Sequence, residues 1–360
     1  MSRIFNFGAG PATIPVEVLE EAQKQLLDYK GEGLSIMEAS HRSKIYDEVH
    51  TEAMSLVREL YEVPEDYDIL FLQGGASTQF AMVPMNLSQG GKAEYADTGS
   101  WSSKAIKEAK IQGIDYKIIA SSKDSTYNHI PENINFSDDA DYAYITSNNT
   151  IYGTQYKKFP STKAPLVVDA SSDIFSYIMD WSKVDLLFAG AQKNAGPSGL
   201  TIVIIKKELQ SRVADNVPSM FRYDTHAKND SLYNTPPTFG IYMLGLTLKW
   251  IKGQGGIKAI QKSNEEKARL LYDAIDNSNG FYLGHAKKDS RSLMNVSFNI
   301  KDKDSNLEAK LVEQATSAGM IGLKGHRSIG GLRASIYNAM SLEGMQALVD
   351  LMNQFAADNK

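Results

Sequence analysis

The sequence contains no cysteine. This absence excludes disulfide bonds, thiolate metal sites and cysteine nucleophiles. Excess positive charge is also lacking: the formal net charge of -5 argues against nucleic acid or an anionic membrane surface as the main partner. No apolar run approaches membrane-spanning length, and the initial MSRIFNFGAGP lacks the layout of a signal peptide. We therefore expect a cytoplasmic protein that binds neither membrane nor nucleic acid.

The composition is that of an ordinary folded protein. Hydrophobic residues make up 42% of the chain and charged residues 22%, which is typical of globular domains. A chain of 360 residues is longer than one hydrophobic core usually serves, so we expect two domains. The six histidines show no metal-ligand spacing with a carboxylate, so we expect no metal site.

Helix-like and strand-like stretches alternate along the chain, and this order favours an α/β fold with a mostly parallel sheet. The apolar spacing predicts amphipathic helices over 15–30 and 44–62. Short apolar segments predict buried strands at 68–72, 142–146, 165–170, 184–189 and 200–205.

The glycine-rich segment GQGG at 253–256 interrupts this pattern, and we place a domain boundary near it. After it come an alternating strand, MNVSFNI, a helix around 307–318, a strand, RASIYNA, and a closing amphipathic helix. These elements predict a smaller α+β domain. The expected division is a large domain over 15–255 and a small domain made of 1–14 and 256–360.

Two chemically informative features lie where predicted strands end. The turn QGGAST, residues 73–78, precedes a helix that we expect to begin near Thr78 or Gln79, and the free amides of a helix start suit a phosphate group. Asp169 lies at the carboxyl end of the strand predicted at 165–170, on the edge where open α/β sheets bind ligands. A buried carboxylate there requires a cationic partner. Considered alone, a Gly-Gly turn before a helix is more often only a connection without a bound ligand. An aspartate at such a position, considered alone, is more often a helix cap or one partner of an internal salt bridge.

Lys193 lies in GAQKNAGPSG, between two apolar segments that read as strands. Its alanine and glycine neighbours leave room for a flat ligand, and the flanking strands limit solvent. Such surroundings lower the pKa of an amine and favour the neutral nucleophile. The phosphate turn, Asp169 and Lys193 together match what pyridoxal phosphate requires: an anchor for its phosphate, a partner for its ring nitrogen and an amine for its aldehyde.

Motifs along the whole chain carry a family resemblance. They include NFGAGPATIP, EASHRS, LQGGAS, DTGSWS, SNNTIYGTQ, VVDASSD, GAQKNAGPSG, YNTPPTF and GHRSIGGLRASIYNAM. With these motifs the sequence resembles the phosphoserine aminotransferases, which are fold type I pyridoxal-phosphate enzymes of the class V aminotransferase group. The resemblance implies a large domain with a seven-stranded-type sheet, a smaller C-terminal domain, a pyridoxal 5'-phosphate cofactor and a homodimer with shared active sites. It also implies a ping-pong transamination in serine biosynthesis, in which glutamate and 3-phosphohydroxypyruvate give 2-oxoglutarate and O-phosphoserine.

The resemblance implies roles for individual residues around the cofactor. Lys193 corresponds to the Schiff-base lysine, Asp169 to the carboxylate that keeps the pyridine nitrogen protonated, and Trp101 to the aromatic residue stacked on the ring. Thr150 corresponds to the hydroxyl that bonds the cofactor's phenolic oxygen. The cofactor phosphate is expected to contact Gly75, Ala76, Ser77 and Gln192, together with the neighbouring subunit's Asn234 and Thr235.

Cations are expected on the substrate side, because the substrates carry carboxylate and phosphate groups. Arg333 corresponds to the arginine that binds the α-carboxylate in a forked geometry, which lysine cannot supply. Some family members have an arginine where this chain has Ser77, so phosphate recognition is expected to depend on the His-Arg pairs. These pairs are His41 with Arg42 and His326 with Arg327.

Two alternatives stay open from the sequence. Another class V enzyme, such as an alanine–glyoxylate type aminotransferase, would not need the His-Arg pairs. A nucleotide- or phosphate-binding protein could use the QGGAST turn alone, although no GxGxxG or GxxxxGK[ST] pattern follows a strand here.

Overall fold

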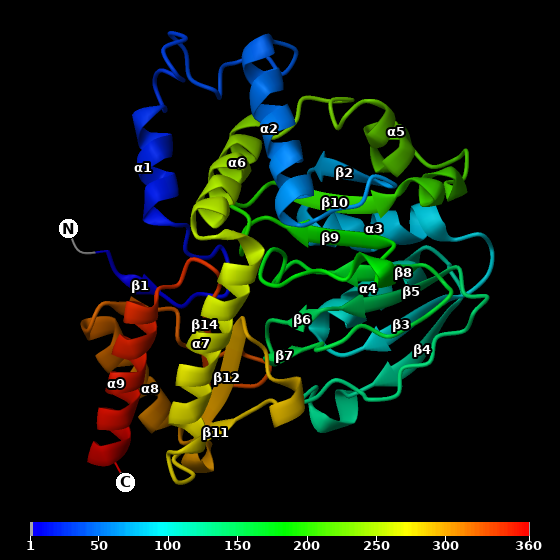
Figure 1. The fold of residues 1–360 in the computed structure, drawn as a ribbon. Helices are drawn as coiled ribbons and strands as arrows, with labels where there is room; N and C mark the ends of the chain where they lie inside the picture. The colour runs from blue at the N-terminus through cyan, green and yellow to red at the C-terminus, as the bar shows by residue number, and fades with distance from the viewer. Residues whose placement is uncertain (1–2, 360) are drawn as a thin grey trace.

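The computed structural model describes residues 3–359 and has an α/β architecture built on a seven-stranded sheet (Figure 1). Strand β10 is antiparallel to both of its neighbours, and the other adjacent pairs are parallel. The predicted α/β class with a mostly parallel sheet is therefore confirmed. The strand order is β2 (Tyr67–Leu72), β10 (Thr201–Lys206), β9 (Leu186–Gly190), β8 (Leu166–Asp169), β5 (Tyr142–Thr146), β3 (Ala93–Asp97) and β4 (Tyr116–Ser121).

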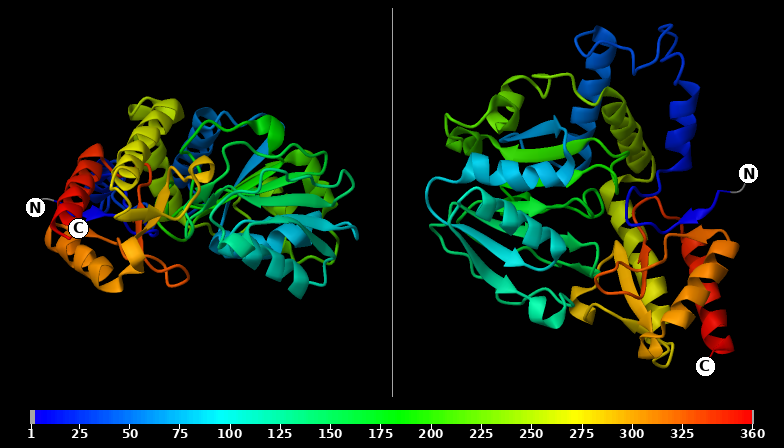
Figure 2. Two further views of the ribbon diagram at one scale, coloured as in Figure 1. Left: turned by 90° about the horizontal axis from the view of Figure 1, so that it is seen from below. Right: turned by 180° about the vertical axis from the view of Figure 1, so that it is seen from behind.

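Helices cover both faces of this sheet (Figure 2). Successive side chains of a strand point to opposite faces. Ile202 and Ile204 accordingly pack in one apolar cluster with residues of α2 (Lys44–Leu60) and α6 (Thr238–Gly253), whereas Val203 and Ile205 pack in another with residues of α3 (Gly75–Leu87) and α4 (Ser100–Ile111). The helices are α1 (Val16–Lys24), α2 (Lys44–Leu60), α3 (Gly75–Leu87), α4 (Ser100–Ile111), α5 (Tyr223–Lys228), α6 (Thr238–Gly253), α7 (Gly256–Asp276), α8 (Ser305–Ser317) and α9 (Leu342–Asp358).

The five predicted strands are present as β2, β5, β8, β9 and β10, with ends shifted by at most two residues. Strands β3 and β4 were not predicted. Strand β3 is fully buried but contains Glu94 and Asp97, whose carboxylates accept hydrogen bonds from serine side chains. Strand β4 pairs only with β3 at one edge of the sheet and is half exposed. Neither strand therefore shows the continuous apolar run of a central strand.

Two predicted helix ends are wrong. Helix α1 ends at Lys24 rather than at residue 30, because the following segment turns back on itself: Asp28 accepts a hydrogen bond from the amide of Gly33. Helix α3 begins at Gly75 rather than near Thr78, since Gly74 adopts a left-handed conformation with φ 90° and starts the helix. The first backbone amides of α3 are therefore those of residues 75–77, which the sequence pattern assigns to the turn.

The C-terminal part has its own three-stranded antiparallel sheet, β11 (Tyr282–Gly284), β12 (Asn295–Ile300) and β14 (Leu332–Ser335). Residues of these strands share an apolar cluster with α7, α8 and α9. Strand β1 (Phe5–Asn6) pairs in parallel with β13 (Met320–Ile321), so the start of the chain lies beside the C-terminal elements (Figure 1). This arrangement supports the division into 15–255 against 1–14 plus 256–360, which stays a prediction.

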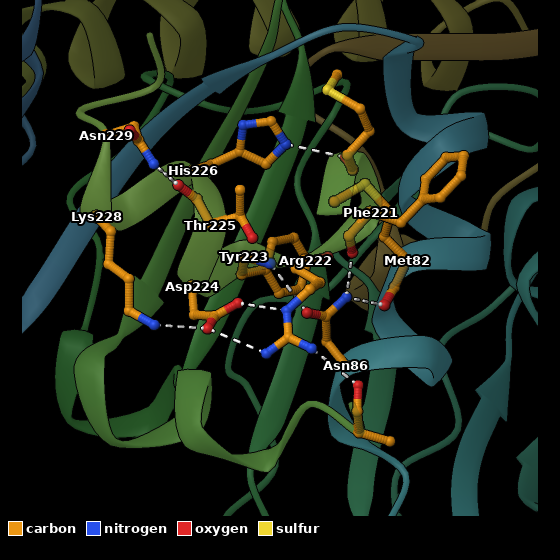
Figure 3. Close-up of polar contacts among 12 residues, drawn as sticks. Met82, Asn86, Phe221, Arg222, Tyr223, Asp224, Thr225, His226, Lys228 and Asn229 are labelled. Carbon is orange, nitrogen blue, oxygen red and sulfur yellow. Dashed lines mark hydrogen bonds and ion pairs between the residues drawn. The ribbon is translucent and has the colours of Figure 1, made fainter. Parts of the chain in front are cut away.

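A polar cluster anchors α3 to the segment that leads into α5 (Figure 3). The amide of Asn86 donates to the carbonyl oxygens of Phe221, at 2.7 Å, and Met82, at 2.8 Å. Arg222 donates to both carboxylate oxygens of Asp224, at 3.0 and 3.2 Å, and this pairing lowers the pKa of Asp224. The C-terminal half of α3 is therefore held in place, which fixes the direction of its N-terminus.

Within residues 3–359, no helix combines the length and the apolar character needed to cross a bilayer. A short two-stranded antiparallel ribbon, β6 (Asn148–Asn149) and β7 (Thr154–Gln155), follows β5 near the carboxyl edge of the large sheet.

Candidate active site

A cavity of about 810 Å³ lies at the carboxyl edge of the large sheet. The turn before α3, the start of α4, the end of β8, the connection between β9 and β10, and the segment around β14 all contribute to its wall. The cavity brings together most of the site residues predicted from the sequence: Gly75, Ala76, Ser77, Trp101, Thr150, Asp169, Gln192, Lys193, His326, Arg327 and Arg333.

Lys193 occupies the turn between β9 and β10, and its amine faces the cavity. Its Nζ donates a hydrogen bond to Oγ1 of Thr150 at 2.7 Å. The pKa of Lys193 is lowered to about 8, mainly by burial; the negative charge of Asp169 opposes this change, and the positive charge of Arg333 contributes to it. A sizeable fraction of this side chain is therefore a neutral, nucleophilic amine in mildly alkaline solution.

Asp169 is the last residue of β8 and is 3% exposed. Burial raises the pKa of its carboxyl group, while hydrogen bonds from Ser171 and the charge of Lys193 oppose this change. The cationic partner expected from the sequence is not present as an ion pair: in residues 3–359 no Lys, Arg or His nitrogen lies within 4.0 Å of the carboxylate. The carboxylate instead accepts from the amide of Ser171 at 3.0 Å.

Another part of the cavity wall, the start of α3, is suited to an anion. Gly75, Ala76 and Ser77 form the first turn of α3, where backbone amides have no partners within the helix. The aligned peptide dipoles make such a helix start favourable for negative charge. The first turn of α3 can therefore bind a group of the size of phosphate.

Trp101 begins α4 and flanks the space next to Lys193, whose Nζ lies 5.7 Å from the centroid of the indole ring. The Nζ of Lys104 lies 4.4 Å from the same centroid. Lys104 lines the cavity but was not predicted, although its position three residues after Trp101 on a helix places the two side chains on one face.

Cations are in excess around the cavity. Arg333 lies on β14, and its Nη1 donates to the carbonyl of Thr150 at 3.4 Å, while its Nε has no partner in the described part of the chain. His326, Arg327 and Lys104 line the same space, and Asp169 is the one carboxylate among the lining residues within 3–359. Burial and these neighbouring positive charges lower the pKa of His326. The cavity therefore favours a ligand with several negative charges.

Four predicted residues do not line this cavity. His41 and Arg42 precede α2, and Asn234 and Thr235 precede α6. The carbonyl of Thr235 accepts a hydrogen bond from Gln73, next to the glycine turn, at 3.0 Å. Within a single chain, these four side chains are not brought to Lys193.

Sequence reasoning also missed the N-terminal wall of the cavity, Ala9 to Pro11. The backbone of Gly10 lies against the reactive lysine, since a Cβ built on Gly10 would lie 3.5 Å from Cγ of Lys193. The motif GAGP was visible, but nothing in it indicated which distant residue it contacts.

The residues present fit pyridoxal phosphate. In the described part of the chain the buried carboxylate of Asp169 has no ion-pair partner, so it can accept a hydrogen bond from a protonated ring nitrogen. The amine of Lys193 can hold an aldehyde, the first turn of α3 can hold a phosphate, and Trp101 offers a flat ring beside them. A protein that used the glycine turn alone would not require this combination.

The comparisons with known proteins agree with this chemistry. The family described as Aminotransferase class-V matches residues 4–348. A phosphoserine aminotransferase of Campylobacter lari is 58% identical over 355 residues, covering 98% of this chain and 99% of the relative. The phosphoserine aminotransferase of Bacillus subtilis is 54% identical and covers 100% of both chains.

Solved structures give the same answer. The phosphoserine aminotransferase from Bacillus circulans subsp. alkalophilus superposes with a TM-score of 0.97, at 50% identity and 99% coverage of each chain. An alanine–glyoxylate aminotransferase from Nostoc has a TM-score of 0.71 at 15% identity, covering 99% of this chain and 96% of the other, and this likeness concerns the fold alone. The resemblance seen in the sequence is therefore confirmed: the chain belongs to the class-V aminotransferase family, in the group of the phosphoserine aminotransferases.

Proposed function

We propose that this chain is a pyridoxal-phosphate-dependent aminotransferase that transfers the amino group of glutamate to 3-phosphohydroxypyruvate, giving O-phosphoserine and 2-oxoglutarate, in serine biosynthesis. The observation that carries the proposal is one cavity lined both by the amine of Lys193 and by the buried carboxylate of Asp169, which forms no ion pair within residues 3–359. The names of the relatives and the excess of cations around the cavity support the phosphorylated substrate.

The cofactor, when bound, supplies an electron sink that stabilises negative charge developing at the substrate's Cα. Asp169 would hold the proton on the ring nitrogen, and Trp101 would flank the ring. Lys193 would take the proton from Cα with its neutral amine and deliver it again as the ammonium, so a pKa of about 8 suits both tasks. Thr150 orients the amine, because its hydroxyl accepts the hydrogen bond from Nζ.

Substrate binding is assigned to the cations. Arg333 would hold the α-carboxylate through two parallel hydrogen bonds, since its Nε is left free by the rest of the described chain. His326 and Arg327 would bind the substrate phosphate. Ser77 adds no positive charge at this position, so the phosphate site depends on the remaining cations.

A homodimer would complete the site. Asn234, Thr235, His41 and Arg42 lie outside the cavity of their own chain, which supports their acting in the cavity of a second copy. Apolar side chains are exposed on the segment that leads to His41, among them Leu27 at 86%, and a partner would cover them. The cytoplasmic location stays a prediction from the sequence.

The test is the absorbance spectrum of the purified protein supplied with pyridoxal phosphate, recorded before and after glutamate is added. We expect a visible band that shifts with glutamate and recovers with 3-phosphohydroxypyruvate. Pyruvate and glyoxylate serve as matched unphosphorylated acceptors. A protein that gains no band would contradict the cofactor assignment, and equal recovery with glyoxylate would favour the alanine–glyoxylate type of activity instead.

A further inference from the structure

A second lysine is more deeply buried than Lys193 and has no part in the chemistry described above. Lys267 lies on α7 and is 0% exposed. Its Nζ donates to the carbonyl oxygens of Tyr337, at 2.7 Å, Ile336, at 3.2 Å, and Asn338, at 3.5 Å. Within residues 3–359 no carboxylate lies within 4.0 Å of this amine, so it is not half of a buried ion pair.

The three carbonyls explain why a lysine is tolerated there. Residues 336–338 follow β14, and the carbonyl of Tyr337 also accepts from the amide of Met340 at 2.9 Å. The carbonyls of Ile336 and Asn338 have no backbone donor within residues 3–359. A buried carbonyl without a donor is costly, and a flexible side chain with several N–H groups can satisfy three at once. Asn264, one turn earlier on α7, adds a hydrogen bond from its amide to Oδ1 of Asn338 at 2.9 Å. Helix α7 therefore holds residues 336–338 through two side chains, Lys267 and Asn264.

The first connection between residues 336–338 and Lys193 runs through Asn194. The amide of Asn338 donates to Oδ1 of Asn194 at 3.0 Å, and Nδ2 of Asn194 donates to the carbonyl of Ile174 at 3.1 Å. Asn194 is the residue that follows Lys193 and is 5% exposed. The position of residue 338 thus sets the position of the turn that carries the reactive amine.

A second route reaches the other side of the same amine. The hydroxyl of Tyr337 donates to the carbonyl of Ala9 at 2.8 Å. Ala9 and Gly10 line the cavity, and the backbone of Gly10 lies against the Lys193 side chain. Both contacts around Lys193 therefore depend on the segment that Lys267 holds.

We propose that Lys267 is a positioning residue for the reaction centre: its amine holds the carbonyls of residues 336–338 and through them fixes the turn at Asn194 and the wall at Ala9. It touches neither cofactor nor substrate. Catalytic geometry is sensitive to displacements of about 1 Å, which can cost roughly 100-fold in rate.

The first test replaces Lys267 with a residue of similar length and no donor. Lys267→Met should lower kcat by about 10- to 100-fold while KM for glutamate changes much less. Leu271→Ala is the matched control, because Leu271 lies one turn further on α7 and is also 0% exposed. It should lower the melting temperature and leave kcat unchanged. Wild-type kcat in folded Lys267→Met, or an equal loss of kcat in Leu271→Ala, would overturn the proposal.

The second test uses the cofactor-free protein and measures hydrogen exchange. The amides of Ala195 and Gly196 bond to the carbonyl of Ala191 at 3.0 and 2.9 Å and report on the turn around Lys193. Lys267→Met should speed exchange at residues 191–196 and at Asn338 but not in β5. Uniformly faster exchange, or none, would contradict a local positioning role. The kinetic test rests on the proposed function and the exchange test does not, so failures of the two can be told apart.

The third test restores the amine chemically. Because the chain has no cysteine, Lys267→Cys provides a single thiol that 2-bromoethylamine converts in denaturant into a lysine-like side chain. After refolding, the alkylated variant should regain the kcat of wild-type protein taken through the same cycle, whereas the unalkylated variant should not. No difference between the two would overturn the proposal. If neither refolds, Tyr337→Phe still tests the route to Ala9, with a loss of several-fold in kcat expected and unchanged kcat contradicting it.

Discussion

Lys193, which is half-buried, and Lys267, which is fully buried, differ in their surroundings more than in their pKa. Burial lowers the pKa of both, to about 8 for Lys193 and about 7 for Lys267. Lys193 faces a cavity with Asp169 near it, whereas Lys267 is enclosed and bonded to three carbonyls. A lowered pKa alone therefore does not identify a reactive amine. Lys193 is distinguished by its access to a cavity and by the nearby carboxylate of Asp169, which forms no ion pair within residues 3–359.

The largest expected effect comes from removing the cavity-facing amine. Lys193→Ala should lower kcat by at least about 10⁴-fold, because the residue acts in more than one step. Its melting temperature should change little, since Lys193 forms no ion pair within residues 3–359 and its amine donates only to the hydroxyl of Thr150 there. Steady-state assays and thermal unfolding measure both. Lys206→Ala, at the far end of β10, is the control and should retain activity. Activity within tenfold of the wild type would remove Lys193 from the reaction.

The next effect separates Asp169 from a neighbouring buried carboxylate. Asp173 is also buried, but it bonds to Ser147 at 2.5 Å and Gln155 at 3.1 Å and does not line the cavity. Asp169→Asn should lower kcat by about 10²- to 10³-fold, as expected for losing one preorganised charge. Asp173→Asn should cost much less. Equal losses measured side by side would mean that Asp169 has no special relation to the ring nitrogen.

A smaller effect tests the substrate cations. Arg327→Leu should reduce kcat/KM for 3-phosphohydroxypyruvate by about 10-fold and leave that for glutamate nearly unchanged, because one charged hydrogen bond is lost. Arg42→Leu should act in the same way if a second chain supplies it. Kinetics with both substrates decide the matter. Equal losses for glutamate would place these arginines outside the phosphate site.

The smallest effect is a pH dependence. Only the neutral amine attacks an aldehyde, and a pKa of about 8 means that its fraction rises with pH. Cofactor uptake by the cofactor-free protein should therefore speed up about fivefold from pH 7 to pH 8 and level off above it. Stopped-flow absorbance measures the rate, with N-acetyl-lysine as the control for the cofactor's own titration. In Lys267→Met the midpoint should stay the same; a shifted midpoint would mean that the two amines are coupled.

The fold could be predicted where burial leaves a simple pattern. Strands such as β5 and β10 are buried on both faces and read as apolar runs. Strand β3 is equally buried but contains Glu94, whose carboxylate bonds to Ser137, and no local pattern indicates that distant partner. The end of α1 was misplaced for a related reason, since the turn after it is fixed by hydrogen bonds such as that between Asp28 and Gly33.

Only those site residues could be predicted that lie at the ends of predicted strands or in recognisable motifs. Lys193 and Asp169 were found because both follow buried strands at one edge of a parallel sheet. Lys267 was not found, because on a helix with many lysines its burial depends on carbonyls about 70 residues later in the chain. His41 and Arg42 are the converse case: motifs predicted them, and a single chain does not bring them to the cavity.

The pairing of β1 with β13 bears on how the chain folds during synthesis. Phe5 pairs with Met320, 315 positions later (320 − 5), and Phe7 belongs to the C-terminal apolar cluster. At about 5–20 residues per second, a ribosome needs roughly 15 to 60 seconds to make the partner of the first strand. The strands of the large sheet are therefore all synthesised before β1 can pair. If translation stops before Met320, the nascent chain lacks the strand with which β1 pairs.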